Sequence, residues 1–212
     1  MKTVITLSIV WLSICTTHGQ QITEKRMSFS GNETIDLNIR IADSIRLQTW
    51  DKNEVFVTAS VKINDNKDNE AYLISFKDEG NVIAIDANFR EDYFKGRNNC
   101  CDEETDIYWQ IYIPERAVFS MESINADITI TGKTEEMKVK SISGFIDLSF
   151  PERQSADIEF STITGTIYSN HTLAMPDMNR GSRAVIKEKL NNGGPLIDLE
   201  TISGDIFFRK SG

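Results

Sequence analysis

The sequence predicts an all-β protein whose second half consists of stacked strands, as in a β-helix or β-solenoid. Apolar and polar residues alternate with a period of two along most of the chain, a pattern typical of half-buried strands. No window shows a convincing helical period. A six-residue pattern recurs four times after residue 121, and such recurrence indicates a repeat architecture. We therefore expect a repeat region over residues 121–210, preceded by an irregular β region.

The first 19 residues have the features of a secretory signal peptide. Lys2 supplies the positive start, the stretch from Val4 to Cys15 is mostly apolar, and small residues at Thr17 and Gly19 fit signal peptidase cleavage. The apolar stretch is shorter than the roughly 20 residues that a membrane-spanning helix needs, and no later segment is apolar enough to span. We expect export to the periplasm, cell surface or medium, with residues 20–212 forming one all-β domain.

Cys15 leaves open a second route of export. Residues 12–15 resemble a bacterial lipoprotein signal, in which the cysteine is lipidated and anchors the chain. The residue before that cysteine is normally small, and Ile14 is not. Simple secretion is therefore favoured over lipid anchoring through Cys15.

Strand signals follow one another through the irregular β region. The alternating segments end at Pro114, which cannot donate a hydrogen bond to a neighbouring strand. Between two of them, residues 78–81 form a turn signal, which predicts a hairpin. The predicted strands cover residues 35–41, 45–47, 55–63, 72–76, 82–87 and 107–113. They would cap one end of the repeat region or extend its sheets.

The repeat has the form hydroxyl, Ile, small polar residue, Gly or Ala, any residue, Ile. Its copies start at residues 123, 141, 162 and 201, and the spacings are 18, 21 and 39 residues. The last spacing is about two periods, so residues 170–200 would contain a fifth, degenerate unit or an inserted hairpin, with a strand at 184–190. The structural residues of the repeat are Ile124, Ile128, Ile142, Gly144, Ile146, Ile163, Gly165, Ile167, Ile202, Gly204 and Ile206.

The spacing within each copy predicts how it packs. Both Ile and the small residue share one parity, so an extended chain would point them to the same side. We expect both Ile to stack between successive coils and build the core, while the Gly allows a bend or a close backbone approach. The alternative is an antiparallel sandwich whose strands are similar by coincidence. Four copies in one register favour the solenoid.

Composition excludes several classes of function. The chain has 23 Lys and Arg against 32 Asp and Glu, a formal net charge of −9. Nucleic acid and anionic membrane surfaces are poor partners for such a chain, because both require clustered cations. His18 lies in the leader, so His171 would be the only histidine of the exported chain. Multi-His metal sites and most His-dependent catalysis are then hard to build.

Cys100 and Cys101 are adjacent in an acidic loop. The simplest interpretation is two thiols or a vicinal disulfide, which would close a very small, strained ring. A soft-metal site is the alternative, since thiolates bind such metals. The spacing fits neither a zinc site nor a redox pair with two intervening residues. We predict no metal and no cofactor.

The acidic segments do not form a recognisable catalytic or calcium site. Residues 64–70 resemble a calcium loop but lack its Gly and its final Glu, and the Asp102–Asp106 cluster has no defined ligand geometry. Pairs of acids for a glycosidase or lyase cannot be identified without coordinates. We therefore expect that the protein is not an enzyme.

Aromatic residues are the candidate contact surface. Tyr108 and Tyr112 have the parity opposite to Trp109, so they lie on opposite faces of one strand. One of these faces must pack in the core, and the sequence does not determine which. Aromatic rings bury area and stack on sugars and peptides, which makes these Tyr a predicted ligand patch. Tyr93, Phe94 and Trp50 are further possibilities.

Three segments resemble the bacterial putative-adhesin family, a domain of unknown function related to the head-GIN-type auto-transporter adhesins. They are residues 45–57, residues 111–114 and the Ile-Ser-Gly-x-Ile repeats that end at Gly204, Asp205 and Ile206. The resemblance covers about residues 30–210. It implies a right-handed β-helix-like fold in the cell envelope and supplies no catalytic residues. Cys100, Cys101 and residues 170–200 do not belong to the family pattern.

These observations predict a non-catalytic, secreted or cell-envelope binding module, an adhesin by family resemblance. Its partner would be a protein or a glycan at the cell envelope, recognised across a broad sheet face or an open coil edge. One alternative is a structural or regulatory envelope protein that binds a protein partner. A carbohydrate-active β-helix enzyme is the weaker alternative.

Overall fold

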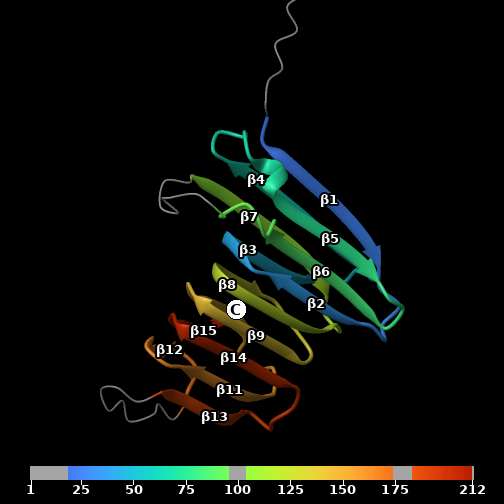
Figure 1. The fold of residues 1–212 in the computed structure, drawn as a ribbon. Coiled ribbons are helices and arrows are strands. Elements are labelled where there is room, and N and C mark those ends of the chain that lie inside the picture. The colour runs from blue at the N-terminus through green and yellow to red at the C-terminus, as the bar shows by residue number, and fades with distance from the viewer. Residues whose placement is uncertain (1–18, 96–103, 174–182, 212) are drawn as a thin grey trace, which may run out of the picture.

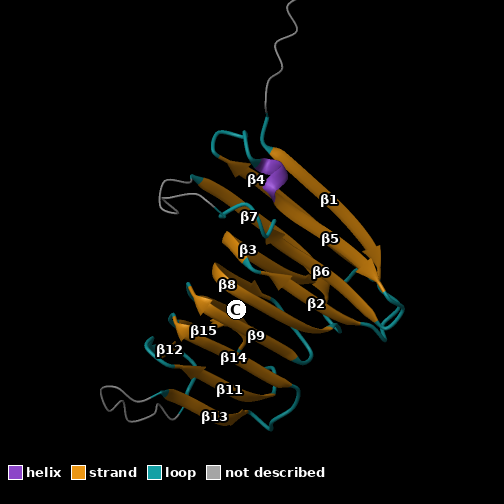
Figure 2. Ribbon diagram, in the orientation of Figure 1, coloured by secondary structure: helices purple, strands orange, loops and turns teal. Residues whose placement is uncertain are grey.

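The computed structural model describes residues 19–95, 104–173 and 183–211, and most of them are in strands (Figures 1 and 2). The described helical structure is a single 3-10 turn, η1 (Asn69–Ala71), so the all-β prediction is confirmed. The strands form one connected network that is open at its ends.

The strands of the irregular region are β1 (Gln21–Ser28), β2 (Thr34–Ile39), β3 (Ile41–Trp50), β4 (Glu54–Ile63), β5 (Tyr72–Asp78), β6 (Val82–Phe89) and β7 (Thr105–Pro114). Those of the repeat region are β8 (Val118–Thr131), β9 (Met137–Ser143), β10 (Ile146–Pro151), β11 (Ala156–Thr162), β12 (Ile167–Ser169), β13 (Ala184–Leu190), β14 (Leu196–Ser203) and β15 (Ile206–Ser211).

The long strand β8 belongs to two sheets. Its first part pairs with β2 and β9, and its last residues pair with β3 and β10. The β9 sheet has the order β5-β6-β2-β8-β9-β14-β11-β13. The β7 sheet has the order β1-β4-β7-β3-β8-β10-β15-β12. The central strands of both sheets are parallel, and antiparallel pairs lie at both ends of the β9 sheet and at the β1 end of the β7 sheet. At its other end the β7 sheet stays parallel, since β12 pairs parallel with β15.

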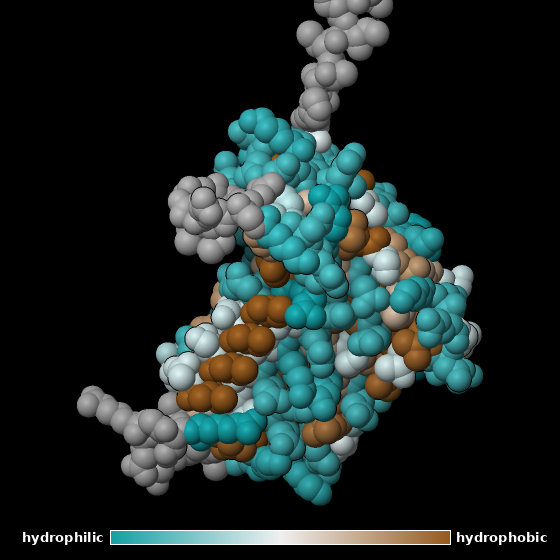
Figure 3. All heavy atoms as spheres, in the orientation of Figure 1, coloured by the Kyte–Doolittle hydropathy of each residue, from teal (hydrophilic) through white to brown (hydrophobic). Residues whose placement is uncertain are grey.

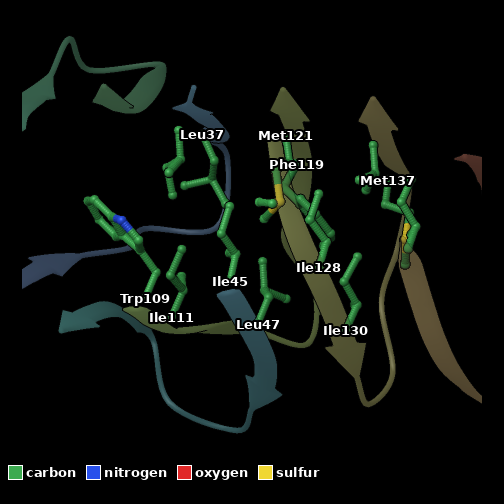
Figure 4. Close-up of a cluster of buried hydrophobic side chains, with 14 of the residues drawn as sticks. Leu37, Ile45, Leu47, Trp109, Ile111, Phe119, Met121, Ile128, Ile130 and Met137 are labelled. Carbon is green, nitrogen blue, oxygen red and sulfur yellow. The ribbon is translucent and has the colours of Figure 1, made fainter. Parts of the chain in front are cut away.

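The two sheets pack on each other through a continuous apolar core. Strand parity directs one set of side chains from each sheet inward, so that Leu37 and Met121 of the β9 sheet meet Ile45, Trp109 and Ile130 of the β7 sheet (Figure 4). These side chains are almost completely buried. Each buried large apolar side chain stabilises the fold by about 1.5–3 kcal/mol, which makes this layer the main source of stability.

Each repeat copy carries the chain around a corner from the β9 sheet to the β7 sheet. The second Ile of the copies forms a buried ladder in the order Ile128, Ile146, Ile206 and Ile167, and Ile45 continues it on the other side of Ile128. This half of the predicted Ile packing is confirmed.

The corners stack backbone against backbone, as predicted for the small residue. A Cβ atom added to Gly204 would lie 1.7 Å from the carbonyl oxygen of Gly144, and one added to Gly165 would lie 1.8 Å from that of Gly204. At Gly144 the nearest atom is the carbonyl oxygen of Ala126, at 2.1 Å. Only the smallest side chains fit this column.

The expectation for the first Ile of each copy was wrong. Ile142, Ile163 and Ile202 are 44%, 50% and 43% exposed, and Ile124 is half-buried. The parity argument assumed an extended chain, but the corner lies between the two Ile of each copy and reverses the relation between them. The first Ile therefore points outward from the β9 sheet.

The copies do not stack in chain order. The fourth copy, in β14 and β15, lies between the second copy, in β9 and β10, and the third copy, in β11 and β12. The second and third copies are therefore not neighbours in the stack, and the last copy in the sequence lies between them. This order differs from the successive coils that we expected, and it does not confirm a right-handed β-helix. The parallel pairing of these strands also disagrees with an antiparallel sandwich.

The strand predicted at 184–190 is β13, and it is neither a repeat copy nor part of a hairpin. It pairs antiparallel with β11, on the side away from β14. Of the two roles considered for the irregular region, the structure shows extension: its strands continue both sheets. The hairpin predicted around residues 78–81 is formed by β5 and β6.

Candidate functional site

The outer face of the β7 sheet carries the predicted tyrosines. Along β7, Trp109 and Ile111 point into the core, whereas Tyr108, Gln110 and Tyr112 point outward. Tyr108 and Tyr112 lie about 13 Å apart along the strand, from the rise per residue. They therefore share one face without forming one contiguous aromatic patch. Their role in ligand binding remains a prediction.

Tyr112 belongs to a stack of aromatic rings. Its ring centroid lies 4.9 Å from that of Trp50 and 6.1 Å from that of Phe56. Lys52 Nζ lies 4.5 Å from the Trp50 ring centroid, and the Arg26 guanidinium lies 4.0 Å from that of Phe56. These cation–π and ring contacts occupy the ring faces, so this group stabilises the sheet surface more than it offers a stacking platform.

Tyr108 has a more open environment. It is 47% exposed, and its cross-strand neighbours are the small residues Ser44 and Ser60. Its hydroxyl lies 3.5 Å from Asp106 Oδ1, and the Asp106 carboxylate raises the pKa of Tyr108. The phenol therefore stays protonated at neutral pH, and about half of the side chain is available to a ligand.

Polar side chains surround the exposed tyrosine. The next row across the sheet contains Thr58, Gln110, Arg46 and Thr129 in register. It offers amide, guanidinium and hydroxyl groups beside an exposed ring. Such a combination suits a polar ligand with an apolar face, such as a sugar.

A second aromatic group lies at the other end of the same face. Tyr168 stacks on Phe207 with ring centroids 5.1 Å apart, and Arg209 lies 5.3 Å from the Phe207 centroid. Tyr168, Phe207 and Arg209 line a shallow cavity of about 350 Å³. Arg209 also pairs with Asp147 at 3.0 Å, although burial raises the pKa of that carboxyl. Sequence reasoning missed this group; the signal was the aromatic residue after the second Ile in two copies.

The outer face of the β9 sheet carries a groove of about 320 Å³. Ile124, Ile142 and Ile202 line one side of it, and Lys140 and Glu200 line the other. Figure 3 shows a row of hydrophobic residues that descends across the strands of this sheet. Sequence reasoning placed these Ile in the core and so missed the groove.

The acidic turn that resembled a calcium loop is satisfied by protein groups. Lys62 Nζ lies 3.5 Å from Asp65 and 3.4 Å from Asp106, and its hydrogen bond to Asp106 raises the pKa of Lys62. Asn69 accepts a hydrogen bond from the Ile63 backbone at 2.8 Å. Among the described residues, no group of three or more His, Cys, Asp or Glu is placed to hold a metal ion.

The other residues considered from the sequence are dispersed. Tyr93 is buried, Phe94 is 42% exposed, and both pack against Phe89. Cys100 and Cys101, like the leader with Cys15, lie outside the described residues. Among the residues that the structure describes, no helix has the length and apolar character needed to cross a membrane.

Comparison with known proteins gives a fold and no established family. No protein-family model matches the chain, and no curated protein matches it. The solved structure of a putative cell adhesion protein from Clostridium sporogenes is similar, with a TM-score of 0.55 and 9% identity over 91% of this chain and all of that one. A putative adhesin from Bacteroides fragilis has a TM-score of 0.29 at 10% identity, covering 91% of this chain and 98% of that one. The Clostridium structure shows a shared fold, and the family resemblance in the sequence stays a prediction.

Proposed function

We propose that the chain is a non-catalytic binding module, exported to the cell envelope or secreted, that recognises a glycan through the outer face of the β7 sheet. The observation that carries this proposal is Tyr108, an exposed ring on an open sheet with Gln110 and Arg46 in the neighbouring row. The similarity to the Clostridium cell adhesion structure and the sequence resemblance to adhesins support the same function.

Binding would combine stacking with hydrogen bonds. The C–H face of a sugar ring would pack on Tyr108, and Gln110 and Arg46 would bond its hydroxyls. An aromatic contact and each net hydrogen bond contribute about 0.5–1.5 kcal/mol, so one sugar would bind only weakly. Useful affinity would then come from several contacts along a polymer or from several copies of the module.

The test is a glycan-array screen followed by calorimetry with the mature chain. Tyr108→Ala should reduce binding about two- to tenfold, because it removes the ring contact without disturbing the core. Tyr168→Ala is the matched control, since Tyr168 is equally exposed (48%) at the other end of the face. If both variants bind like the parent, the Tyr108 face is not the site. Release of shorter products from a bound polysaccharide would contradict the non-catalytic assignment.

Export and domain extent are part of the proposal. Removal of residues 1–19 would give a chain that starts at Gln20, folded as one domain. The mass of the protein from its native host tests this: a lipidated chain that starts at Cys15 would contradict simple secretion. The vicinal disulfide between Cys100 and Cys101 would lower the same mass by two hydrogens.

From the family resemblance we also propose a more specific architecture for the repeat region. Residues 121–210 would be a right-handed β-helix-like stack in which the fourth copy has been inserted between the second and third. The four stacked corners support this idea. An experimental structure with left-handed crossovers between the sheets would contradict it.

A structural or regulatory envelope protein is the second candidate. The apolar groove on the β9 sheet favours it, since exposed apolar rows mark protein contacts. Crosslinking of a tagged copy in the native host, followed by mass spectrometry, would distinguish the two. One envelope protein captured at near-equal yield would support this candidate, whereas glycan capture alone would support the first.

A further inference from the structure

The first Ile of each repeat copy forms an exposed row on the β9 sheet. In spatial order the row contains Ile124 on β8, Ile142 on β9, Ile202 on β14 and Ile163 after β11. Neighbouring strands are about 4.8 Å apart, so these side chains form one continuous apolar ridge. Three of them are more than 40% exposed. Figure 3 shows a row of hydrophobic residues on this face. A ridge of this size on a soluble protein indicates an interaction surface.

The row of side chains next to this ridge carries charges of alternating sign. Glu122 on β8, Lys140 on β9 and Glu200 on β14 are in register. The next position belongs to Ser161 on β11, whose hydroxyl accepts a 2.7 Å hydrogen bond from Arg183. The Arg183 guanidinium therefore lies over β11, and it also pairs with Glu200 at 3.1 Å. Lys140 Nζ lies 3.3 Å from the other carboxylate oxygen of Glu200. The signs along the row are negative, positive, negative and positive.

A third row continues the pattern. Lys138 on β9 faces Asp198 on β14, with 3.8 Å between Nζ and Oδ2. At the two flanks of the same row, Asp36 lies on β2 and Lys187 lies on β13. Consider the line that runs between β9 and β14, parallel to the strands. Lys138 and Asp198 lie at equal distances on either side of it, and so do Asp36 and Lys187. The two charges of each pair are opposite in sign.

Because equivalent positions on the two sides of this line carry opposite charges, the face is electrostatically complementary to the same face of a second copy. A two-fold axis parallel to the strands, between β9 and β14, places β9 of one copy over β14 of the other and β8 over β11. Lys140 and Glu200 pair within each copy, and this rotation brings each of them to the opposite charge of the second copy as well, while Glu122 meets its Arg183. The same rotation places the Ile ridge over the Ile ridge. We propose that two copies of this chain associate through the outer faces of their β9 sheets.

The available area sets the strength of the association. Six strands from β2 to β13 at about 4.8 Å spacing, over about 20 Å of strand length, give roughly 600 Å² per copy. Stable complexes bury about 1,200–2,000 Å² in total, so this interface lies at the lower limit and the dimer is weak. Two residues depart from the charge pattern: Arg40, at the end of the Ile ridge, would lie at the rim, and Glu159 is paired with Lys187 of its own chain.

A partner of another kind is less favoured by these charges. It would need an apolar strip beside four alternating charges at strand spacing, and a second copy already has both. The dimer would leave the Tyr108 faces on opposite outer sides. If the proposed glycan site is correct, the dimer would therefore present two sites. The association itself does not depend on that site.

Sedimentation velocity and native mass spectrometry of the mature chain test the dimer over a range of protein concentrations. We expect a reversible dimer that weakens at high salt. Lys140→Glu and Glu200→Lys should each weaken it at least tenfold, because each places like charges opposite one another. The two variants mixed together should form a heterodimer, since the new carboxylate at position 140 of one copy then meets the new ammonium group at position 200 of the other. This rescue requires that position 140 of one copy face position 200 of the other, as the proposed contact does.

The controls separate the interface from general effects of charge and folding. Lys133→Glu makes the same charge change at an exposed loop residue outside the three rows and should leave the dimer intact. Thermal melts should show that all variants fold, and Ile142→Thr gives a second, uncharged disruption of the ridge. A parent chain that stays monomeric at every concentration would overturn the proposal. So would a dimer that neither single charge reversal weakens.

Discussion

The two isoleucines of each repeat copy are the same residue in the same short motif, yet their environments are opposite. Ile146 is completely buried, whereas Ile142, four residues earlier, is 44% exposed. The chain turns a corner between them, at a Gly whose neighbours in the stack leave no room for a side chain. The difference shows that a short repeat can encode two surfaces: one that forms the core and one that faces solvent.

A charge placed at each of the two Ile positions in turn tests this difference most directly. Ile146→Asp should lower the free energy of unfolding by about 4 kcal/mol or more, because the unpaired carboxylate would be buried in an apolar layer. Ile142→Asp should cost less than about 1 kcal/mol, since its side chain already meets water. Chemical denaturation followed by circular dichroism measures both. Equal losses would mean that the first Ile also belongs to the core.

The corner between the two isoleucines is the next target. Gly204→Ala should destabilise the protein by about 3 kcal/mol, because the new methyl group would overlap the carbonyl oxygen of Gly144. Gly80→Ala is the control: Gly80 has a positive φ of 78° but open space around it, so the cost should be about 1 kcal/mol. Similar losses at the two glycines would contradict backbone stacking at the corner.

Sequence reasoning could find the parts of the fold that depend on local pattern. Alternation located most strands, and the recurring Gly located the corners. It failed where the answer depends on how the chain is bent or connected. Parity carries no information across a bend, so the exposure of Ile142 was missed, and with it the groove and the charged rows beside it. Nearly identical copies also do not encode their order in a stack, so the insertion of the fourth copy could not be read from spacing.

The candidate site also shows that features within one strand could be predicted, whereas contacts between strands could not. The parity of Tyr108 relative to Trp109 could be read from the sequence because both lie on one strand. Tyr112 has the same parity, but its ring is covered by Trp50, which comes from another strand. Contacts of that kind depend on strand order, and only the structure supplies it.

Among the described residues, His171 is the buried side chain whose charge can change near neutral pH, and it gives the smallest predicted effect. His171 is buried and stacks on Phe208, two residues after Ile206, with ring centroids 4.2 Å apart. Burial lowers the pKa of His171 below its usual value of 6.5, so the neutral ring is the folded form. The unfolded chain then binds the proton more readily, and the stability that His171 contributes is present above pH 6.5 and lost as the pH falls below it.

Replacing His171 tests whether stability falls with falling pH, as this argument requires. The free energy of unfolding of the parent chain should fall more between pH 7.5 and pH 5 than that of His171→Phe, by up to about 1.4 kcal/mol for each unit of pKa shift. Glu152 is present in both proteins, and its hydrogen bond to Lys210 lowers the pKa of Glu152, so that this carboxylate stays charged in the interval. The difference between the two proteins therefore isolates the imidazole. If His171→Phe shows the larger acid loss, the ring is charged in the folded protein, and the buried side of the motif tolerates a cation beside its core.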